Sequence, residues 1–531
     1  MGGMKRPADD ELEAEGIGAK RRKCPYLDTI NHQLLDFDFE KVCSISLSDQ
    51  NVYACLVCGK FFQGRGKSTH AYTHSVQNGH HVFINLQNDR IYCLPDNYEV
   101  VDTALQPIKN ALRPTFHLDA VAKLDANRLL AQDAFGVSYL PGFIGLNNLK
   151  HTDYINVVVQ ALAHVPPLRD YFLLTSNTVG KTKSNLVLRF GELVRKMWSP
   201  HNFKNTISPH EFVQEVSVSS KKRFHVGQQN ESVEFLSWLL NELHRGLGGS
   251  HKPGSSVIHK CFQGLVEVQT TDDTKPAITV DEDDEEEKKS EDAPASTPSV
   301  AKTTKTPFLL LSLDLPSTPL FKDCQCGNII PQIPLFTVLE KYDGKHVTHV
   351  LQGSQRLQKT YSIKSLPSYL IFHVKRFTRN NFFVEKNPTI VNFPIKNLEL
   401  RDYVQFDTEV HSEEELKAMS ITQLRELLIK HKTSWKDCVE KADLVDKAVR
   451  VVLPATKYNL IANVCHDSPV TTGKETAALK ANPLTEGSYR VHLQNRATEQ
   501  WYEIQDLHVQ ETMPQLIGVS ESYLMIYERK Q

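Results

Sequence analysis

Apolar residues recur along this chain with two different periods, and the period changes with position. In the first part of the region 141–531, the stretches VVVQALAHVPPLRDYF and VEFLSWLLNELHRGL repeat apolar residues every three or four positions, which predicts buried helices. After residue 306, FLLLSLDLP, PSYLIFHVKRF and TIVNFPI are short apolar runs bounded by turn residues, which predicts strands. Strand patterns return at residue 457, in KYNLIANVCH, GSYRVHLQ and YLMIYE. The sequence therefore predicts one large α+β domain over 141–531.

Three segments depart from this pattern. Residues 116–140 place apolar residues at helical spacing and are predicted to form a helical linker. Residues 402–452 carry two amphipathic stretches, SEEELKAMSITQLRELLIKHK and WKDCVEKADLVDKAV, which predict a helical insertion. This insertion is faintly similar to SAP-type modules, which contact nucleic acid or proteins, but a packed surface hairpin is the simpler interpretation. Residues 269–306 are acidic and rich in Pro, Ser, Thr and Lys, so we expect a disordered insertion there.

The charge of the chain is nearly balanced, but its distribution is not. The 531 residues contain 61 Lys and Arg and 63 Asp and Glu, which gives a formal charge of −2. Residues 281–292 alone carry nine acids and two lysines, so the rest of the chain is mildly basic. This balance excludes a uniformly basic nucleic-acid coat. Residues 1–23 are predicted to be a disordered tail, and its two basic clusters are typical either of a nuclear import signal or of a solvated tail.

The sequence also bears on the cellular compartment. No apolar run reaches the roughly 18 residues that a membrane span needs, and the N-terminus lacks the apolar stretch of a secretion signal. We therefore expect no membrane association. In such a chain, ten cysteines suggest thiols or metal ligands rather than a disulfide framework.

Four side chains in the first hundred residues have the spacing of metal ligands. Cys55 and Cys58 are separated by two residues, and His74 and His80 follow with five residues between them. Two thiolates and two imidazoles complete the tetrahedral shell that structural zinc prefers, with no position left open for catalysis. The alternative is a set of buried cysteines and surface histidines without a metal. We expect one structural zinc ion at these four residues.

The stretch CLVCGKFFQGRGKSTHAYTHSVQNGHHVFINL resembles a ubiquitin-hydrolase-type (UBP) zinc finger, and the resemblance covers 24–115. Members with several zinc ions carry further ligands. The chain keeps part of each further set and replaces the rest; the retained residues are Cys43, His70, Cys24 and Cys93, and the replacements are Ser46, Gln63, Tyr26 and Asp96. The resemblance therefore implies a single zinc ion. Arg65 matches the family's pocket for the ubiquitin C-terminus, but Tyr92 is a weak match for its aromatics, so we do not expect ubiquitin binding through the finger.

A second resemblance covers most of the remaining chain. GFIGLNNLKHTDYINVVVQAL resembles the Cys box of ubiquitin-specific proteases, and YNLIANVCHDS, GSYRVHLQN and WYEIQD resemble their His box. This implies a papain-like fold. At the positions of the nucleophile, the base and the orienting carboxylate, the chain has Asp153, Ser488 and Gln505. Of the residues around the triad, Asn148 and Asp506 remain.

Without these side chains, the chain lacks the groups that the family uses to hydrolyse its substrate. The family's nucleophile is a thiolate activated by an imidazole, and neither Asp153 nor Ser488 can take these roles near neutral pH. His492 is predicted to lie about 13 Å from Ser488 along one strand, too far to replace the base. His466 and Cys465 belong to the preceding strand and have no Cys-box context. We therefore predict that the chain is not an enzyme.

Two further features are weaker. A second zinc ion, which many active proteases hold between two CxxC pairs, is not expected because only Cys324 and Cys326 are present. The run KRFTRNNFFVEKNPTIVNFP interleaves aromatic and basic residues. It is either an interaction surface or a strand pair whose aromatics point inward and whose cations point outward.

The combination of finger and degenerate protease domain resembles an inactive, splicing-associated branch of the ubiquitin-specific proteases. The resemblance implies a nuclear scaffold that supports assembly or maintenance of the U4/U6.U5 tri-snRNP. The implied partners are U5 and tri-snRNP proteins, and small nuclear RNA is a further candidate. Two other functions remain open: a ubiquitin or ubiquitin-like binding module without hydrolase activity, and an isopeptidase with unusual chemistry.

Overall fold

The computed structural model describes residues 23–272, 302–317, 330–352, 355–379, 384–405, 413–430, 433–435, 438, 440–452, 455–468 and 482–530. The chain divides into two compact units. Unit 1 takes its described residues from 1–115, 130–141 and 198–211, and unit 2 takes them from 116–129, 142–197 and 212–531. Two short segments beyond residue 115 thus group with the finger region.

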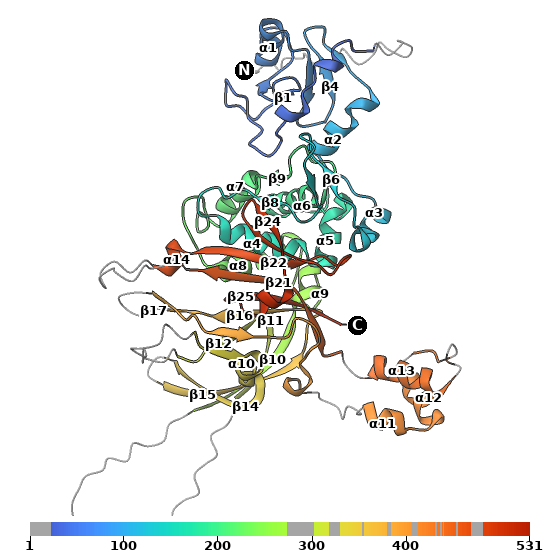
Figure 1. The fold of residues 1–531 in the computed structure, drawn as a ribbon, viewed down its shortest axis with the longest axis vertical. Coiled ribbons are helices and arrows are strands. Elements are labelled where there is room, and N and C mark those ends of the chain that lie inside the picture. The colour runs from blue at the N-terminus through green and yellow to red at the C-terminus, as the bar shows by residue number, and fades with distance from the viewer. Residues whose placement is uncertain are drawn as a thin grey trace, which may run out of the picture. The chain divides into compact units, whose positions relative to one another are not determined.

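Unit 1 is built around an antiparallel five-stranded sheet with the order β2-β1-β3-β4-β5 (Figure 1). Its elements are β1 Val52–Cys55, β2 Phe61–Gln63, α1 His70–Asn78, β3 Val82–Asn85, β4 Ile91–Cys93, β5 Tyr98–Glu99 and α2 Gln106–Leu112. Alternate residues of the strands enter two separate apolar clusters, so both faces of the sheet are covered. Cys55, the last residue of β1, belongs to the smaller cluster.

The predicted helix over 116–140 is wrong for most of its length. Only α3 Leu118–Ala122 and a short 3-10 turn over Leu124–Ala126 are helical, and a two-stranded hairpin of β6 Ala131–Gln132 and β7 Ser138–Tyr139 follows. The Asp133 carboxylate accepts hydrogen bonds from the backbone N–H groups of Phe135 and Val137, at 2.9 and 2.8 Å. Side-chain bonds of this kind compete with the helix and favour a turn. Gly136 supplies the positive φ of 80° that the turn requires.

Unit 2 contains most of the helices. They are α4 Asp153–Ala163, α5 Pro166–Leu173, α6 Asn185–Trp198, α7 His210–Ser219, α8 Ser232–Gly246, α9 Val257–Phe262, α10 Leu335–Leu339, α14 Pro483–Glu486 and α15 Pro514–Gly518. All 11 residues of α4 are buried, as expected for a helix that is apolar on every side. Prolines in the first turn of α5, α14 and α15 suit a position where the N–H has no helical partner.

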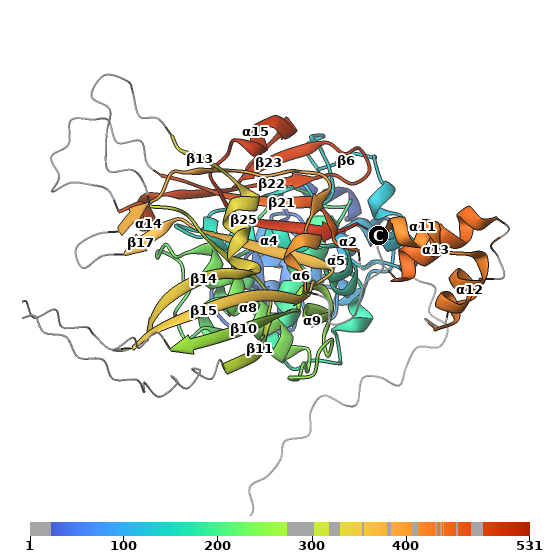
Figure 2. The same cartoon turned by 90° about the horizontal axis from the view of Figure 1, so that it is seen from below.

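The strands of unit 2 form two main sheets (Figure 2). One has the order β12-β16-β25-β21-β22-β23-β24, with β20 beside β21, and the other has the order β11-β10-β15-β14. The bounds of the first sheet are β12 Leu311–Asp314, β16 Tyr369–Lys375, β20 Leu398–Glu399, β21 Lys457–Asp467, β22 Ser488–Gln494, β23 Trp501–Gln505, β24 His508–Thr512 and β25 Ser522–Arg529. The bounds of the second are β10 Gly264–Asp272, β11 Lys302–Phe308, β14 Asp343–Gln352 and β15 Gln355–Ser365. The shorter strands of unit 2 are β8 Gly145–Leu146, β13 Gln332–Pro334, β17 Phe377–Arg379, β18 Val384–Lys386 and β19 Ile390–Asn392, while β9 Thr206–Ile207 belongs to the segment 198–211 of unit 1.

The larger sheet positions the protease-like site. Helix α4 lies against β21, β22 and β23, so its first residue meets the start of β22. Elsewhere the sheet packs its apolar residues into the main core of unit 2, which includes Phe372, Trp501 and Tyr527. This core does not involve the positions of the expected triad.

The predicted helical insertion is present as α11 Glu413–Ala418, α12 Ile421–Lys430 and α13 Lys441–Val452. These helices bury their own apolar cluster, centred on Leu416, Leu424, Leu428, Leu444 and Ala448. A separate cluster of this kind is what an amphipathic hairpin needs in order to pack on itself. The structure therefore fits the interpretation as a packed hairpin.

Several predictions fall wholly or partly outside the described residues. They are the basic clusters of the tail, the acidic run 281–292, and Cys324 and Cys326. The ends of the predicted insertion 269–306 do lie in described residues, and there the chain forms the paired strands β10 and β11. None of the helices in the described ranges has the length and apolar character needed to cross a membrane.

Candidate zinc site and degenerate protease site

The two cysteines of the expected zinc site lie on a tight turn between β1 and β2. The N–H of Gly59 bonds the Cys55 carbonyl at 2.9 Å, and the N–H of Cys55 bonds the Lys60 carbonyl at 2.9 Å. Gly59 has a φ of 74°, and a Cβ there would lie 2.1 Å from the Leu34 carbonyl oxygen. Only glycine fits this position, and the turn it allows points both sulfur atoms to one side.

The two histidines come from α1 and from the residue that follows its C-terminal glycine. His74 lies within the helix, and Gly79 ends it in the left-handed conformation, with its N–H bonded to the Ser75 carbonyl at 3.0 Å. This end turns His80 back toward His74. The ring of Phe62 stacks on His74 with centroids 4.2 Å apart, which fixes the orientation of the imidazole.

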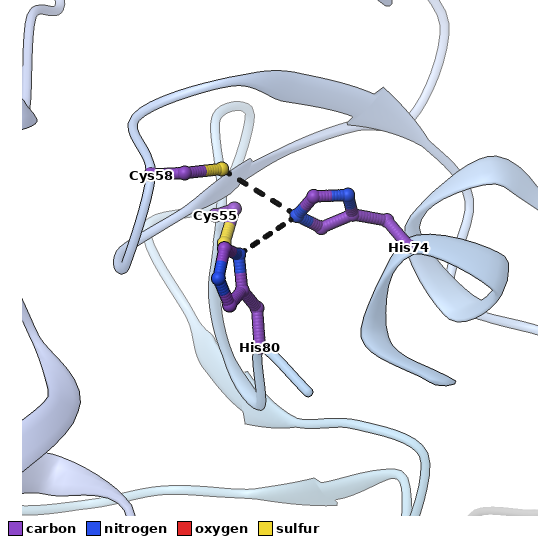
Figure 3. Close-up of side chains that lie close together, drawn as sticks. All are labelled: Cys55, Cys58, His74 and His80. Carbon is purple, nitrogen blue, oxygen red and sulfur yellow. Dashed lines mark hydrogen bonds between the residues drawn. The ribbon is translucent and has the colours of Figure 1, made fainter. Parts of the chain in front are cut away.

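The four side chains converge (Figure 3). The Cys58 Sγ lies 3.4 Å from His74 Nε2, the Cys55 Sγ lies 3.5 Å from His80 Nδ1, and the two ring nitrogens are 3.0 Å apart. Tetrahedral zinc with usual bond lengths separates sulfur from nitrogen by about 3.6 Å and nitrogen from nitrogen by about 3.3 Å. The donor set and its dimensions therefore fit zinc. In the part of the chain that the structure describes, no second group of three or more metal-binding side chains converges in this way.

The two thiols are electrostatically coupled. A hydrogen bond with Cys55 lowers the pKa of Cys58 to about 4, and the same bond is the largest cause of the raised pKa of Cys55. The pair thus shares one proton readily. A bound dication deprotonates both sulfurs, since the thiolate is the form that ligates zinc.

The residues that replace further zinc ligands form hydrogen bonds instead. The N–H of Ser46 points to the Cys43 sulfur at 3.5 Å, its hydroxyl donates to Gln63 Oε1 at 2.9 Å, and Gln63 Nε2 donates to the Ser48 hydroxyl at 3.1 Å. This network closes the turn without a metal. At the other position, burial is the main cause that raises the pKa of Cys93 to about 11, and Cys24 beside it adds to the shift.

Arg65 and Tyr92 are brought together, as the finger family would require. The guanidinium lies 4.1 Å from the centre of the Tyr92 ring. Its Nη1 donates to Asn97 Oδ1 at 2.7 Å. The arginine is therefore held by a cation–π contact and by an amide from its own unit.

At the protease-like site, Asp153 acts as an acceptor between elements. Its Oδ2 accepts a hydrogen bond from the N–H of Tyr489 at 2.8 Å and another from Gln229 Nε2 at 3.2 Å. Gln229 also donates to the Gly487 carbonyl at 3.1 Å. Burial raises the pKa of the Asp153 carboxyl, and these hydrogen bonds oppose the shift. We call this set of contacts among Asp153, Gln229, Gly487 and Tyr489 the Asp153 clamp. It joins the start of α4, the loop before α8 and the start of β22.

The other two triad positions also meet. Gln505 Nε2 donates to the Ser488 hydroxyl at 3.3 Å. The retained Asp506 accepts from Asn148 Nδ2 at 3.0 Å and from Asn156 Nδ2 at 3.1 Å. The structure thus brings Asp153, Ser488 and Gln505 to the same end of β22, with carboxylate, hydroxyl and amide groups where the family needs thiol, imidazole and carboxylate.

No described imidazole takes the place of the base. His466 lies near Gly487, and its ring packs edge-on against Tyr489 and Phe377, with centroids 4.8 and 5.0 Å away. Burial lowers its pKa to about 3, so it stays neutral. His492, on the same strand as Ser488, is engaged elsewhere: its Nε2 lies 3.0 Å from Glu503 Oε2.

Sequence reasoning missed a buried polar cluster around His492. Its Nδ1 lies 3.8 Å from the Cys465 sulfur, which also contacts Asn463 Nδ2 at 3.3 Å and the Ser520 hydroxyl at 3.2 Å. Burial opposes the charge on His492, but the bonds to Cys465 and Glu503 outweigh it and raise its pKa to about 9. Cys465, His492 and Glu503 contact one another in the order thiol, imidazole, carboxylate, as the catalytic side chains of a cysteine protease do. The Cys465 side chain, however, is fully buried. No substrate reaches it, so the cluster is structural.

Only the pairing of the strands reveals this cluster. Asn463, His492 and Glu503 are direct neighbours across β21, β22 and β23. A β-bulge between Val464 and Cys465 brings the sulfur to the same place. Gln229 was missed as well, since nothing in its local sequence marks it as a partner of Asp153.

The basic and aromatic run after residue 373 is partly internal. Arg376 is fully buried and donates to the carbonyls of Ser522 and Thr389, both at 2.7 Å. Lys386 forms an ion pair with Glu521. The strand pair is present as β17 and β18, but the expectation that its cations point outward is wrong for Arg376 and Lys386, because backbone carbonyls and a carboxylate hold them inside. Phe382 and Phe383 lie outside the described residues.

Comparisons with known protein families match both parts of the chain. The model described as "Ubiquitin carboxyl-terminal hydrolase" matches residues 144–527, and the model "Zn-finger in ubiquitin-hydrolases and other protein" matches residues 43–105. The predicted fold class is therefore confirmed: a small UBP-type zinc finger followed by an α+β domain of the ubiquitin-specific protease type.

Three relatives cover nearly the whole chain. The human protein named ubiquitin carboxyl-terminal hydrolase 39 is 44% identical over 517 residues, which are 96% of this chain and 80% of that protein. The probable mRNA-splicing protein ubp10 of Schizosaccharomyces pombe is 40% identical, over 95% of this chain and 88% of its own length. The pre-mRNA-splicing factor SAD1 of Saccharomyces cerevisiae is 28% identical, over 99% of both chains.

One solved structure extends the likeness to three dimensions. It is described as the crystal structure of an essential yeast splicing factor and aligns with a TM-score of 0.67 at 27% identity. The alignment covers 95% of this chain and all of the other.

Proposed function

This chain belongs to the ubiquitin carboxyl-terminal hydrolase family, and we propose that it acts within it as a splicing scaffold without hydrolase activity. Its role is to support assembly or maintenance of the U4/U6.U5 tri-snRNP. Two relatives that cover nearly all of the chain are named as splicing proteins, which supports this role. Nuclear localisation and contact with U5 and tri-snRNP proteins are parts of the same proposal.

The observation that carries the absence of hydrolysis is the Asp153 clamp. The carboxylate lies where the family has its thiol, and it is already bonded to the N–H of Tyr489 and the amide of Gln229. A carboxylate is a poor attacker of an isopeptide carbonyl, and Ser488 cannot remove a proton near neutral pH. Removal of single triad members from a well-studied protease costs about 10⁴ to 10⁶ in rate. Replacement of all three leaves no useful turnover.

The clamp also suits a scaffold. In an active protease the nucleophile must remain open to substrate, whereas here three elements are tied together at that position. The site helps to fix the shape of the domain. A fixed shape suits a protein that holds other proteins, because a rigid surface loses less conformational entropy when it binds.

For the metal, we propose that Cys55, Cys58, His74 and His80 hold one structural zinc ion. The donor set is closed, with two sulfurs and two nitrogens. The ion supplies cross-linking of β1 to the end of α1, not chemistry on a substrate. The finger thus serves as a rigid part of the scaffold over 24–115, and the protease-like domain over 141–531 supplies the rest.

Affinity purification of the tagged full-length protein from nuclear extract tests the role. Mass spectrometry and RNA extraction should find U5 proteins together with U4, U5 and U6 small nuclear RNA. Recovery of ubiquitin conjugates without these RNAs would instead support the alternative, a ubiquitin-binding module. Release of a fluorophore from ubiquitin C-terminal amide by the purified protein, and its loss in Asp153→Ala, would contradict the absence of hydrolysis.

A further inference from the structure

A surface groove along α8 contains a partly exposed tryptophan. The groove has a volume of 440 Å³, and Trp238 lies among its lining residues. The rings of Phe224 and Phe235 pack against the indole, with centroids 5.4 and 5.9 Å away. The indole is therefore held in one place while part of it faces the groove.

Two arginines line the same groove, and each is paired with a glutamate. Arg223 Nη2 lies 2.8 Å from Glu234 Oε2, and Arg245 Nη2 lies 2.9 Å from Glu242 Oε1. The arginine side chains remain 55% and 73% exposed, so these pairs are surface contacts of small energy. The net charge of the lining residues is therefore close to zero.

The excess positive charge comes from the turn that leads into the groove. Lys221 and Lys222 directly precede Arg223, and both are exposed. Within the described ranges, no acidic side chain forms an ion pair with either lysine. The turn is well fixed, because the N–H of Lys222 bonds the Ser217 carbonyl at 2.8 Å and the N–H of Phe224 bonds the Ser220 hydroxyl at 3.1 Å.

The backbone of this turn is unusual for lysine. Lys221 and Lys222 have φ values of 54° and 64°, which lie in the left-handed region. After the end of a helix, this conformation is usually taken by glycine or asparagine. Two consecutive side chains in this conformation carry a strain cost that glycine would avoid. Exposed cations at such positions, next in sequence to a residue that lines the tryptophan groove, indicate a binding role rather than a structural one.

We propose that this surface, formed by Lys221, Lys222, Arg223, Trp238 and Arg245, binds single-stranded RNA. A base stacks on the exposed part of Trp238, and the neighbouring phosphates lie against the two lysines. A held aromatic ring beside unpaired cations is the arrangement that proteins use for single strands. A peptide that combines acidic and aromatic residues is the other occupant that the charges allow, and the test below separates it from RNA.

The inference deepens the proposed scaffold role, on which it rests for the source of the RNA. Its test uses only the purified full-length protein and a synthetic RNA. A negative result there leaves co-purification with small nuclear RNA unaffected, because protein partners can bring that RNA. Failure of the proposed function and failure of this surface are therefore distinguishable.

Fluorescence anisotropy with a labelled oligouridine about twelve nucleotides long measures the binding. The wild-type protein should bind with a dissociation constant on the order of 10 µM. Trp238→Ala should weaken binding about tenfold, since loss of one stacked base costs that much or more. The double variant Lys221→Ala/Lys222→Ala should lower the slope of log affinity against log salt by about 1.4, because each phosphate contact on a single strand contributes about 0.7.

Matched variants control for general effects. Trp435→Ala removes another partly exposed tryptophan that also lies beside an arginine, with Arg425 4.4 Å from its ring. Lys181→Ala/Lys183→Ala removes two exposed lysines from a different loop. Neither should change RNA binding, and each variant is assayed well below its own melting temperature, because both indoles pack against apolar neighbours.

Three results would overturn the proposal. The first is wild-type protein that does not bind the oligouridine at 50 mM salt, a value chosen because two phosphate contacts with a combined slope of about 1.4 bind roughly fivefold more tightly there than at about 150 mM salt. The second is equal weakening by the Trp238 and Trp435 variants. The third is an acidic aromatic peptide that binds with Trp238 dependence while the RNA does not, which would assign the groove to a protein partner.

Discussion

The finger and the protease-like site have both lost residues that their families use, yet the losses differ in kind. In the finger, partial ligand sets have been replaced by hydrogen bonds such as that of Ser46 with Gln63, while one complete set of four donors remains. In the protease-like site the resemblance assigns Asp153, Ser488 and Gln505 to the triad positions, and the fold is intact around them. The proposed zinc site lies where a metal would hold a small unit together, and the proposed loss of catalysis lies where the fold does not depend on the triad.

Size explains this difference. The sheet of the finger has five short strands, and a small unit buries too little apolar surface to be stable without a cross-link. The protease-like domain has a large apolar core that includes Phe372, Trp501 and Tyr527, away from the triad positions. That core does not depend on the position of Asp153. The Asp153 carboxylate has a structural role in the clamp.

The largest effect should come from the finger ligands. Cys58→Ser removes one of four zinc donors, and structural zinc contributes about 10 kcal/mol or more to the folding of small fingers. We expect loss of bound zinc, measured by mass spectrometry under native conditions, and unfolding of the finger at ordinary temperature. Cys43→Ser is the matched control, since Cys43 is a cysteine of the same unit, more buried than Cys58, and lies in the hydrogen-bonded turn. If Cys58→Ser kept its full zinc content, the proposal that the finger depends on this ligand set would be wrong.

A smaller effect is expected at the Asp153 clamp. Asp153→Ala leaves the N–H of Tyr489 and the amide of Gln229 without their acceptor in a buried place. Such unsatisfied groups cost about 1–3 kcal/mol each, so the free energy of unfolding should fall by roughly 2–4 kcal/mol. Urea denaturation measures this change. Asp119→Ala, at an exposed position, should leave stability unchanged.

How much of this could be read from the sequence depends on how local each signal is. The four zinc donors have diagnostic spacing within one short stretch, and the structure brings them together. The substituted triad positions were found through resemblance, since nothing about Asp153 by itself marks a former nucleophile. Gln229 and the cluster around His492 depend on pairing between distant segments, which a single sequence does not specify.

The errors have equally specific causes. The helix predicted over 116–140 ends early because the Asp133 carboxylate binds backbone N–H groups and Gly136 permits the turn, and neither effect is visible in apolar spacing. The run after residue 373 left two interpretations open because alternation alone does not say which side of a strand is covered. The strands β17 and β18 do pair, but the buried Arg376 differs from the outward cations that the strand interpretation expects.

The cluster around His492 gives a pH test of a purely structural ion pair. The bond from His492 is the main cause that lowers the pKa of Glu503 to about 2, from an ordinary value of 4.5. A lowered carboxyl pKa contributes stability that is present above pH 4.5 and is lost as the pH falls toward 2. The free energy of unfolding of the wild type should therefore exceed that of Glu503→Gln by about 2 kcal/mol at pH 5, which is less than the full pKa shift would give because solvent screens this partly exposed carboxylate, and the difference should narrow below pH 4.5.

Above neutral pH the histidine of the same cluster gives the opposite pH dependence. Burial opposes the charge on His492, but the bonds to Cys465 and Glu503 raise its pKa to about 9 in the folded protein, from an ordinary value of 6.5. A raised histidine pKa contributes stability that is present below pH 6.5 and is lost as the pH rises toward 9. Arg490, 3.7 Å from Glu503, stays charged throughout. The difference in the free energy of unfolding between the wild type and Glu503→Gln should therefore narrow from pH 7 to 9, and a constant difference over that range, measured by urea denaturation, would contradict this account.

The smallest expected effect is the return of a thiol to the former nucleophile position. Asp153→Cys restores the atom that the family uses, but the residue at the base position is still Ser488, and its hydroxyl accepts from Gln505. Without an imidazole to remove its proton, and buried as Asp153 is, the new thiol should stay protonated, since burial raises a thiol pKa. Purified Asp153→Cys should release no fluorophore from ubiquitin C-terminal amide above the wild-type background. Turnover in this single variant would mean that another imidazole, with His466 nearest to Gly487, can reach the site, and the protease-like domain would then have lost only its nucleophile.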